Sequence, residues 1–598
     1  MSEAEAQGLT LSDYLKSHLA LNDEECCQVL ADYLGIAILD HLHPAQLAQP
    51  QGLAPDRLIP HAHSLRTRDG MTLVSITMPG LRKLKALCDR SPGIRNRIAA
   101  INVRTLRESL SQVYTLRLAR EATTYLHKRD AALSALHVMT PAQAYLCIAG
   151  LAVLLLLGWS IPSVLLVGLN ALLAFTFLSV ALLRLDAAAS ISRTSGPAET
   201  DPEAAYLPSD QCPTYTILVP LYREAEMVSG LIDTLRALDY PGHKLDIKFL
   251  LEADDRETYL ALQKHRHRLD FESHRIAGSG PRTKPKALNV GLQMARGTYV
   301  VVYDAEDRPD PDQLKKAVTA FNAAGSKLAC LQARLDIRNS RDSWLAKQFT
   351  IEYAALFHGL LPDLSHHGLP LPLGGTSNHF RRDILVAVGG WDPHNVTEDA
   401  DLGMRLFRLG YDCRTLASST LEDAPTTLMP WLKQRARWFK GWMQTWLVHM
   451  RRPLATKRNM GFAGFLFFQI MIGGMLLAAF IHPFFIFALG YALYELGSVS
   501  TKNIAELSLF FLNTINLFVG YGAAMLLAYR TLPRAHPDLN RQAIFGLPVY
   551  WVLMSAGAYL ALWDLVTRPH HWHKTPHQSS GVKTEDQTDP ALVHREQK

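Results

Sequence analysis

Hydrophobic residues in this chain gather into long runs that are separated by polar stretches. The runs occupy residues 142–159, 164–183, 462–494, 507–529 and 543–563. A stretch of about 20 apolar residues is long enough to cross a bilayer as a helix. The run at 462–494 has 33 residues and carries Pro483 near its middle, so it predicts two short spans. The pattern therefore predicts six membrane spans.

These runs divide the chain into five parts. We predict a small soluble α+β domain at 1–140, a transmembrane hairpin at 142–184, a larger soluble domain at 211–456, transmembrane helices at 461–565 and a tail at 566–598 whose end is disordered. Lys and Arg residues flank the hairpin and precede the third span, which predicts a cytoplasmic location for the larger domain. Six spans also make the tail cytoplasmic. They leave Arg530, Arg534 and Arg541 outside, against this charge rule.

Periodicity within the soluble parts predicts two different folds. In the first part, helical periodicity at 11–19 and 24–34 is followed by a short strand at 35–39, a hairpin at 65–77 and a helix at 105–127. In the larger domain, buried strands at 215–220, 248–251 and 298–303 alternate with helices that begin near Lys284 and Glu398. Such alternation predicts an α/β domain with a parallel sheet, whose ligands bind at the carboxyl edge.

Composition narrows the class of protein. The net charge of +6 is modest and its basic residues gather beside the apolar runs, which favours contact with anionic lipid headgroups rather than nucleic acid. The seven cysteines are scattered without metal-site spacing, as in a reduced cytoplasm. The polar, acidic start of the chain predicts no cleavable signal peptide.

Acidic residues follow each predicted strand of the larger domain. Glu224 comes after the first strand, Asp254 and Asp255 after the second, and Asp304, Glu306 and Asp307 after the third. Carboxylates at strand ends suit ribose or base hydrogen bonds, and two of them one residue apart suit a hard divalent ion such as Mg²⁺ or Mn²⁺. Glu306 or Asp307 is the second metal ligand beside Asp304. An ordinary turn is the alternative reading of Asp254 and Asp255.

Three further segments carry candidate chemistry. Lys284 and Lys286 lie where a predicted helix begins and suit a diphosphate, although a solvated helix entry explains either lysine equally well. Ser377 and Asn378 follow two glycines and suit sugar hydroxyls, or form a tight polar turn. Thr397 is in position to cap the helix that starts with Glu398 and Asp399, where the helix dipole also favours acids.

The last segment, residues 434–438, lies in a helix at 431–446 that is rich in Trp, Lys and Arg. Such a helix is typical of a membrane interface. Gln434 opens the segment, Arg435 and Arg437 suit a departing diphosphate, and Trp438 offers a ring face for a sugar.

The order of these motifs resembles the family 2 glycosyltransferases, within them the membrane-embedded cellulose-synthase-like group with its D, DxD, TED and QxxRW motifs. The resemblance covers about 240 residues. It implies a Rossmann-like GT-A catalytic domain with Glu224, Asp254, Asp255, Lys286 and Asp304 around a UDP-sugar donor. It also implies that Asp399 removes the proton from the acceptor hydroxyl. The sequence departs from the usual DxD motif, because Glu306 stands at the second acidic position.

The resemblance predicts an inverting hexosyltransferase of a bacterial inner membrane. It would transfer a hexose, with UDP-glucose the first choice, to a growing β-linked polysaccharide, with export through the spans. Within enzymes, the alternative is a single transfer that makes a glycolipid. A catalytically idle membrane receptor that retains the fold is the alternative from another class, and the intact Asp304, Asp399 and QxxRW motif argue against it.

Two terminal segments suggest partners. Residues 29–39 faintly resemble the N-terminal domain of type II secretion ATPases, which predicts a regulatory domain for a protein partner or cyclic di-GMP. The Arg-Leu-Gly opening of the nucleotide-binding motif is absent at 10–15. In the tail, Lys574 and Thr575 follow an aromatic and histidine-rich stretch that resembles a segment near the nucleotide of polysaccharide synthases. We predict that this segment closes over the UDP diphosphate.

Overall fold

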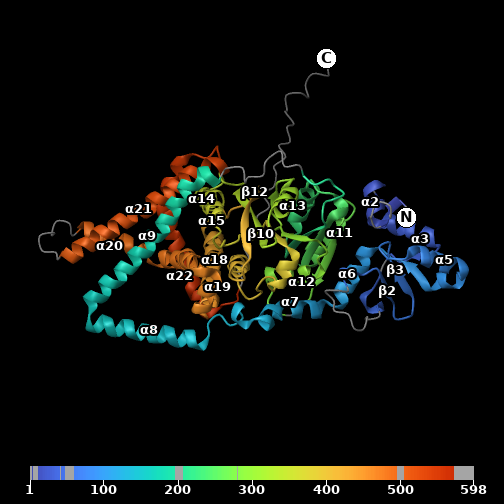
Figure 1. Cartoon of the computed structure of the whole chain (residues 1–598), viewed down its shortest axis with the longest axis horizontal. Coiled ribbons are helices and arrows are strands. Elements are labelled where there is room, and N and C mark those ends of the chain that lie inside the picture. Colours follow the sequence, from blue (N-terminus) through green and yellow to red (C-terminus); the bar gives the residue numbers. More distant parts are fainter. Residues whose placement is uncertain are drawn as a thin grey trace, which may run out of the picture.

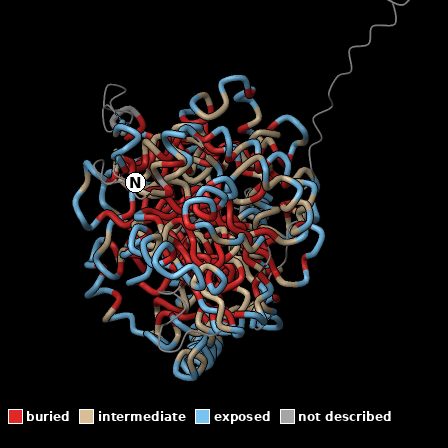
Figure 2. The backbone as a smooth tube through the Cα atoms, turned by 90° about the vertical axis from the view of Figure 1, so that its right-hand side faces the viewer, coloured by how far each residue is buried: buried red, intermediate tan, exposed pale blue. Residues whose placement is uncertain are grey.

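A computed structural model describes residues 3–4, 11–19, 21–40, 42–47, 59–194, 206–278, 280–494 and 504–571. The described chain forms an elongated molecule with three parts in a row (Figure 1). The N-terminal domain lies at one end, the α/β central domain in the middle, and the apolar helices at the other end. When the molecule is viewed along its length, buried backbone lies in the middle of the view and exposed backbone around the outside (Figure 2).

The central domain is built on one eight-stranded sheet. Its strands are β5 (Tyr215–Leu221), β6 (Leu245–Glu252), β7 (Glu272–Ile276), β8 (Tyr299–Val302), β9 (Arg308–Pro309), β10 (Leu328–Ile337), β11 (Asn378–Arg381) and β12 (Asp412–Glu422). The strand order is β7-β6-β5-β8-β11-β10-β12-β9. Strands β5 to β8 are mutually parallel, and β11 runs antiparallel to both of its neighbours. The predicted α/β sheet is therefore confirmed, with an antiparallel strand in its middle.

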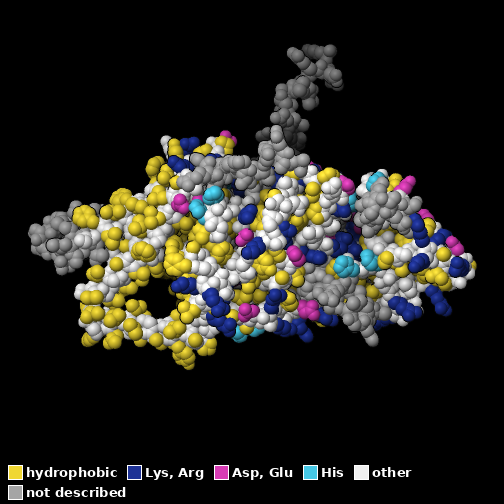
Figure 3. Space-filling view, in the orientation of Figure 1, with side chains coloured by type: hydrophobic (Ala, Val, Ile, Leu, Met, Phe, Trp, Pro, Cys, Tyr) yellow, Lys and Arg dark blue, Asp and Glu magenta, His cyan; other side chains and the backbone are white. Residues whose placement is uncertain are grey.

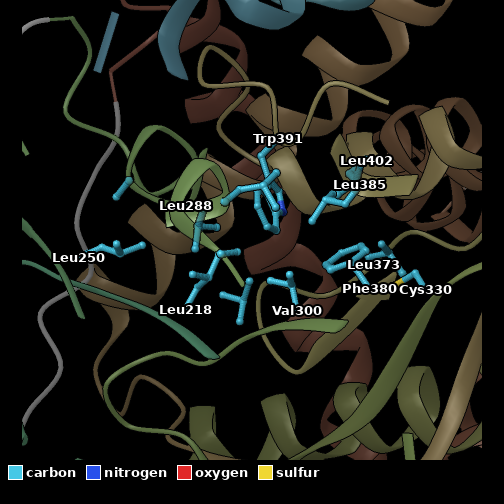
Figure 4. Close-up of a cluster of buried hydrophobic side chains, with 14 of the residues drawn as sticks. Leu218, Leu250, Leu288, Val300, Cys330, Leu373, Phe380, Leu385, Trp391 and Leu402 are labelled. Carbon is cyan, nitrogen blue, oxygen red and sulfur yellow. The ribbon is translucent and has the colours of Figure 1, made fainter. Parts of the chain in front are cut away.

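Helices cover both faces of this sheet. They are α10 (Val228–Arg236), α11 (Arg256–Lys264), α12 (Lys284–Met294), α13 (Gln313–Ala323), α14 (Trp344–Ala355), a π-turn (Leu356–Leu360) with α15 (Leu361–His366), α16 (Arg382–Ala387), α17 (Glu398–Arg408) and α18 (Leu428–His449). Figure 4 shows the core on one face, where Leu218 and Val300 of the sheet approach Leu288 of α12 and Leu402 of α17. This packing fixes the starts of α12 and α17 beside the carboxyl ends of the parallel strands.

The N-terminal domain is a small α+β unit, as the sequence predicts. Its sheet has the order β1-β4-β3-β2, and its elements are α2 (Leu11–His18), α3 (Asp23–Leu34), β1 (Ala37–Ile38), β2 (Ser64–Arg66), β3 (Thr72–Val74), α5 (Leu81–Arg90), β4 (Ile98–Ala100), α6 (Val103–Val113) and α7 (Thr115–Arg129). The single helix predicted at 105–127 is wrong, because Tyr114 ends α6 and begins α7.

The N-terminal domain is tied to the central domain by buried polar contacts. Arg107 of α6 pairs with Glu272 of β7 at 3.3 Å, and both side chains are almost fully buried. Asn289 and Gln293 of α12 donate hydrogen bonds to backbone carbonyls of α7. The buried ion pair fixes α6 against β7, because buried ionic groups are costly to separate, and the amide hydrogen bonds hold α7 against α12.

Five helices in the described ranges are long and apolar enough to cross a membrane. They lie within Pro141–Ser160, Pro162–Ile191, Pro453–Phe487, Phe511–Ala535 and Arg541–Thr567. Their side chains form the hydrophobic surface on one half of the molecule (Figure 3). The predicted division of the run at 462–494 into two short spans is wrong, because the structure has one continuous helical segment there. Helix α19 (Pro453–Phe468) passes through a π-turn (Gln469–Gly474) directly into α20 (Met475–Tyr494), and Pro483 lies inside α20.

Helix α22 (Leu547–Thr567) packs side by side with α18, so both of its ends contact the central domain. At its start, Tyr550 accepts a hydrogen bond from Trp431 of α18. At its end, the carbonyls of Arg568 and His571 accept hydrogen bonds from Lys440, which is also in α18. The described end of the chain therefore emerges beside the predicted interfacial helix.

The basic residues that contradicted the six-span topology also contact the central-domain side. Arg530 and Arg534, near the end of α21 (Ile504–Ala535), donate hydrogen bonds to carbonyls in the last turns of α9 (Pro162–Thr194). The neighbouring residues of α9, Ala187 and Ala188, are buried in the core of the central domain. Arg530 and Arg534 therefore lie beside the central domain.

Candidate active site

One cavity of about 620 Å³ lies at the carboxyl ends of β5, β6 and β8. Its polar end is lined by Tyr222 and Glu224 after β5, Glu252 at the end of β6, Asp304 and Glu306 after β8, and Arg282 and Lys284 at the start of α12. From there it continues between α9, α20, α21 and α22. Sheet edges of this kind are where open α/β folds bind ligands, so the cavity is the candidate active site.

Lys284 and Asp304 form the charged centre of the polar end. The Lys284 Nζ lies 2.5 Å from one Asp304 carboxylate oxygen and donates a 2.8 Å hydrogen bond to the Gly375 carbonyl. The negative charge of Asp304 helps to raise the pKa of Lys284, although burial acts against it. Of the two lysines predicted for a diphosphate, Lys286 is fully buried and pairs instead with Glu252 at 2.8 Å. Lys284 is therefore the basic side chain that faces the cavity.

Asp307 lies behind the cavity wall rather than in it. Its carboxylate accepts hydrogen bonds from the Asp304 backbone N–H at 2.6 Å and from the Thr376 hydroxyl. Burial and the neighbouring charges of Asp304 and Glu306 raise its pKa. Of the two alternatives for the second metal ligand, the cavity therefore favours Glu306.

The acidic end of the cavity fits a divalent cation. Glu422, at the end of β12, joins Asp304 and Glu306 in the wall, and its Oε1 is buried without a hydrogen-bond partner. Asp307 Oδ1 is likewise buried and unsatisfied. Buried oxygens with unused acceptor capacity suit Mg²⁺ or Mn²⁺. Sequence reasoning missed Glu422, because nothing local shows that β12 ends beside β8.

Asp399 lies in the first turn of α17 and faces the same cavity. Its Oδ1 accepts a 2.7 Å hydrogen bond from the Ala400 N–H. A side chain at Gly375 would come within 3.3 Å of Asp399 Oδ2, so the absence of a side chain there leaves the carboxylate accessible. Thr397 precedes the helix, but its side chain makes no capping hydrogen bond, which corrects that prediction.

Burial shifts the titration of the two acids that begin α17. Burial raises the pKa of Glu398 to about 7, with help from the Asp399 charge. Burial also raises the pKa of Asp399, while Lys284 and Arg437 oppose the rise. A carboxylate with a raised pKa is a stronger base than one in water, so Asp399 suits proton removal.

The residues of the QxxRW motif separate into different roles. Gln434 lines the cavity, and its Oε1 has no hydrogen-bond partner. Arg435 is held by Glu352 at 2.7 Å and Tyr550 at 2.9 Å, and its guanidinium lies 4.5 Å from the Trp438 ring centroid. Arg435 also lines the cavity, but these contacts make it a packing anchor between α14, α18 and α22, which disfavours the predicted diphosphate contact. Arg437 lines the cavity near Asp399, as that role requires.

The second strand delivers a different acid from the predicted pair. Strand β6 extends to Glu252, which lines the cavity, whereas Asp254 and Asp255 lie in the following turn. Asp255 is buried, accepts a 2.5 Å hydrogen bond from the Arg223 N–H and caps α11. Asp254 forms a half-exposed ion pair with Arg282. The turn reading is therefore correct for both, while Glu224 lines the cavity as predicted.

Ser377 and Asn378 are structural. Ser377 has a left-handed backbone with φ of 55°, and its buried hydroxyl donates to Thr420. Asn378 is buried and donates to the Gly374 carbonyl. The cavity wall is formed instead by the preceding residues 374–376. Ser377 thus precedes β11 and Asn378 begins it, and neither side chain lines the cavity.

The described end of the chain lies close to this site. His570 contacts the His394 carbonyl at 3.2 Å, and Pro569 accepts a hydrogen bond from Gln444. Lys574 and Thr575 themselves lie outside the described residues. Their contact with a nucleotide stays a prediction.

Comparisons with known proteins agree on one family. Residues 299–494 match the model of glycosyl transferase family group 2. A probable glycosyltransferase of Bacillus subtilis is 24% identical over 61% of this chain and 87% of its own length. A β-monoglucosyldiacylglycerol synthase of Synechocystis (26%) and a poly-β-1,6-N-acetyl-D-glucosamine synthase of Staphylococcus aureus (29%) match 44% and 42% of this chain. The chain covers only 55% and 59% of these two relatives.

The family model and these relatives support a family 2 glycosyltransferase whose central α/β domain is GT-A-like. Among solved structures, a mannosyltransferase of Pyrobaculum calidifontis in complex with GDP-mannose and Mn²⁺ is 19% identical. The match has a TM-score of 0.42 and covers 66% of this chain and 99% of that chain.

Proposed function

We propose that this enzyme transfers a hexose, with inversion, from a UDP-sugar to a hydroxyl group of a membrane-associated acceptor. UDP-glucose is the first choice of donor. The observation that carries the proposal is the single cavity that joins the Lys284–Asp304 pair to Asp399 and then continues between the apolar helices. Donor and acceptor can meet there from opposite ends.

Asp399 is the proposed base. The acceptor oxygen attacks the anomeric carbon of the donor while Asp399 accepts the hydroxyl proton. The bond between that carbon and the diphosphate oxygen breaks on the opposite face, so the configuration inverts and UDP leaves. Arg437, near Asp399 in the cavity wall, offsets the charge that develops on the diphosphate.

Asp304 and Glu306 are the proposed ligands of Mg²⁺ or Mn²⁺, with Glu422 beside them. A divalent ion there would neutralise the diphosphate and stabilise it as a leaving group. Lys284 at the start of α12 adds a second positive charge, and the helix N-terminus itself favours phosphate oxygens.

Glu224, Glu252 and Arg282 form the proposed nucleotide end of the cavity. All three line it, and Glu252 is held in place by Lys286. Carboxylates at two adjacent strand ends can accept hydrogen bonds from ribose hydroxyls and the uracil imide. Asp254 then acts indirectly, through its ion pair with Arg282.

The names of the relatives support both acceptors considered from the sequence. One is a polysaccharide synthase and another a glycolipid synthase. Extension of a β-linked polysaccharide with export, and a bacterial inner-membrane location with the GT-A domain in the cytoplasm, remain part of the proposal. So does a protein or cyclic di-GMP partner for the N-terminal domain.

The test is a panel of radiolabelled UDP-sugars incubated with membranes that contain the full chain. We expect transfer of label from one UDP-hexose, dependent on Mg²⁺ or Mn²⁺, and no transfer by the Asp399→Asn variant. The control is Asp383→Asn, which makes the same chemical change at an exposed residue outside the cavity. It should transfer as much label as the wild type. Absence of turnover with every donor would contradict the proposal and favour an idle protein that retains the fold.

A further inference from the structure

We infer that the acceptor is a hydroxyl-bearing lipid whose acyl chains occupy the apolar part of the cavity. The inference rests on the proposed function and names its acceptor class. It reverses the order of the two acceptors predicted from the sequence. The observations concern the wall of the cavity between α9, α20, α21 and α22, which we call the apolar chamber.

The apolar chamber is lined mainly by aliphatic side chains, methionines and small residues. Helix α9 contributes Phe177, Val180, Ala181, Leu183 and Arg184, and α21 contributes Gly520, Ala524, Leu527 and Ala528. The π-turn contributes Ile470 and Met471, and α20 contributes Met475, Ala478, Ala479 and His482. Helix α22 contributes Leu547, Trp551 and Met554. Positions 471, 475, 478, 479 and 482 recur at helical spacing. One face of that helical segment is therefore turned toward the chamber.

The few polar side chains of the chamber are largely engaged. The Arg184 guanidinium lies 4.8 Å from the centroid of the Trp551 ring. His482 Nε2 hydrogen-bonds the Tyr521 hydroxyl at 2.6 Å. Its Nδ1 has no partner among the described residues, and one ring nitrogen cannot satisfy the several hydroxyls of a sugar unit. Glu352, where the chamber meets the polar end, accepts hydrogen bonds from Arg435 and Tyr550.

This chemistry suits an acyl chain better than a polysaccharide. A hydroxyl buried without a partner destabilises the bound state, and a passing glucan would leave several hydroxyls of each sugar unit without partners. An acyl chain loses none. Met471, Met475 and Met554 have flexible thioether side chains that adapt to different chain shapes.

The arrangement of the cavity wall determines where the acceptor lies relative to Asp399. Asp399, Gln434 and Trp438 lie in its wall together with the chamber residues. A lipid with its chains in the chamber therefore presents a terminal hydroxyl to Asp399. Proton removal by a base is required for a hydroxyl acceptor, whereas an already ionised phosphate headgroup needs none. The structure thus favours a neutral hydroxyl lipid, for which diacylglycerol is a suitable probe.

The experiment uses the full chain in detergent micelles with labelled UDP-glucose and diacylglycerols that differ by two methylenes per acyl chain. We expect label in the organic phase after chloroform–methanol extraction. The specificity constant should rise with chain length until the chamber is full, by less than the fourfold per methylene that corresponds to about 0.8 kcal/mol for transfer from water, because micellar acyl chains already lie in hydrocarbon. The length series needs no variant and is therefore independent of folding defects.

A matched pair of variants localises the effect. Ala478→Phe should raise the KM for diacylglycerol by roughly tenfold, because the new ring fills the chamber. Ala152→Phe makes the same change on the exposed surface of α8 (Pro141–Ser160), outside the cavity, and should leave kinetics unchanged.

The outcomes separate the two levels of inference. Label in a high-molecular-weight product that stays in the aqueous phase would overturn the lipid acceptor while leaving the transferase intact. A flat chain-length profile would also overturn it. No transfer from any UDP-sugar would overturn the proposed function and this inference together.

Discussion

The two ends of the cavity differ in the polarity of the side chains that line them. The polar end gathers charged groups from strand ends and helix starts, and Lys284 and Glu252 have partners of opposite charge at 2.8 Å or less. The apolar chamber gathers Met, Ala and Leu side chains from helices that are themselves hydrophobic. A charged donor can thus enter from water and an apolar acceptor from the bilayer. The two substrates therefore need to meet at only one point, beside Asp399.

The largest expected effect comes from removing the base at that point. Asp399→Asn should lower kcat by roughly 10²–10⁴-fold, because the amide cannot take the proton but keeps the shape. UDP affinity, measured by calorimetry, should change by less than about threefold. Activity close to that of the wild type would remove Asp399 from this role.

The next effect breaks the polar end alone. Asp304→Ala should weaken donor binding and lower activity together, by roughly 10²-fold, and EDTA should stop the wild type reversibly. Glu306→Gln should also reduce the apparent affinity for Mn²⁺. Asp307→Asn should instead lower thermal stability, because Asp307 makes a buried hydrogen bond with Thr376. EDTA-insensitive turnover would contradict a required divalent ion.

A third effect separates packing from chemistry within one motif. Arg435→Met should lower stability by about 2 kcal/mol, because it leaves Glu352 without its ionic partner. Arg437→Met should leave the melting temperature almost unchanged and reduce kcat instead. Thermal unfolding in detergent, paired with initial rates, distinguishes the two. Equal loss of stability in both variants would show that the motif is purely structural.

A smaller effect concerns pH. Because burial raises the pKa of Glu398 to about 7 and also raises that of Asp399, activity should fall as pH drops at values above the usual range for a carboxyl group. Glu398→Gln removes a neighbouring negative charge, lowers the pKa of Asp399 and should move this acid limb to lower pH. A profile of kcat/KM against pH tests the direction. If the acid limb of the profile does not move, the charge of Glu398 does not influence the pKa of Asp399.

The smallest effect is on position rather than rate. Helix α22 has both ends against α18, so Thr567→Cys should be labelled by a membrane-impermeant maleimide only from the side of the GT-A domain. Activity should be unchanged, because Thr567 is exposed. Labelling from the opposite side would contradict this arrangement and indicate that α22 crosses the membrane.

Sequence patterns predicted the scaffold of the site well because strand and helix signals are local. The strands at β5, β6 and β8 and the helices that start at Lys284 and Glu398 lie where periodicity placed them. Asp399, Asp304 and Glu224 accordingly line the cavity. Local order sufficed there, because each carboxylate directly follows a strand or opens a helix.

The errors arose where a distant partner decides the role of a side chain. Glu252, Asp254 and Asp255 are alike in sequence, and only the contact with Lys286 and the cap of α11 separate them. Arg435 is withdrawn from the diphosphate by Glu352, which is 83 residues away. The run at 462–494 was divided because a proline usually interrupts a helix, whereas Pro483 lies inside α20.

The contact between α7 and α12 has a consequence for engineering. Asn289 binds carbonyls of both Ala122 and Trp391, so one side chain joins the N-terminal domain, the helix that carries Lys284 and the loop before Asp399. Deleting residues up to 129 would expose the apolar face of α12 and remove this brace. The N-terminal domain is therefore not a detachable module, and exchange of domains between relatives should keep α7 with the GT-A domain that it supports.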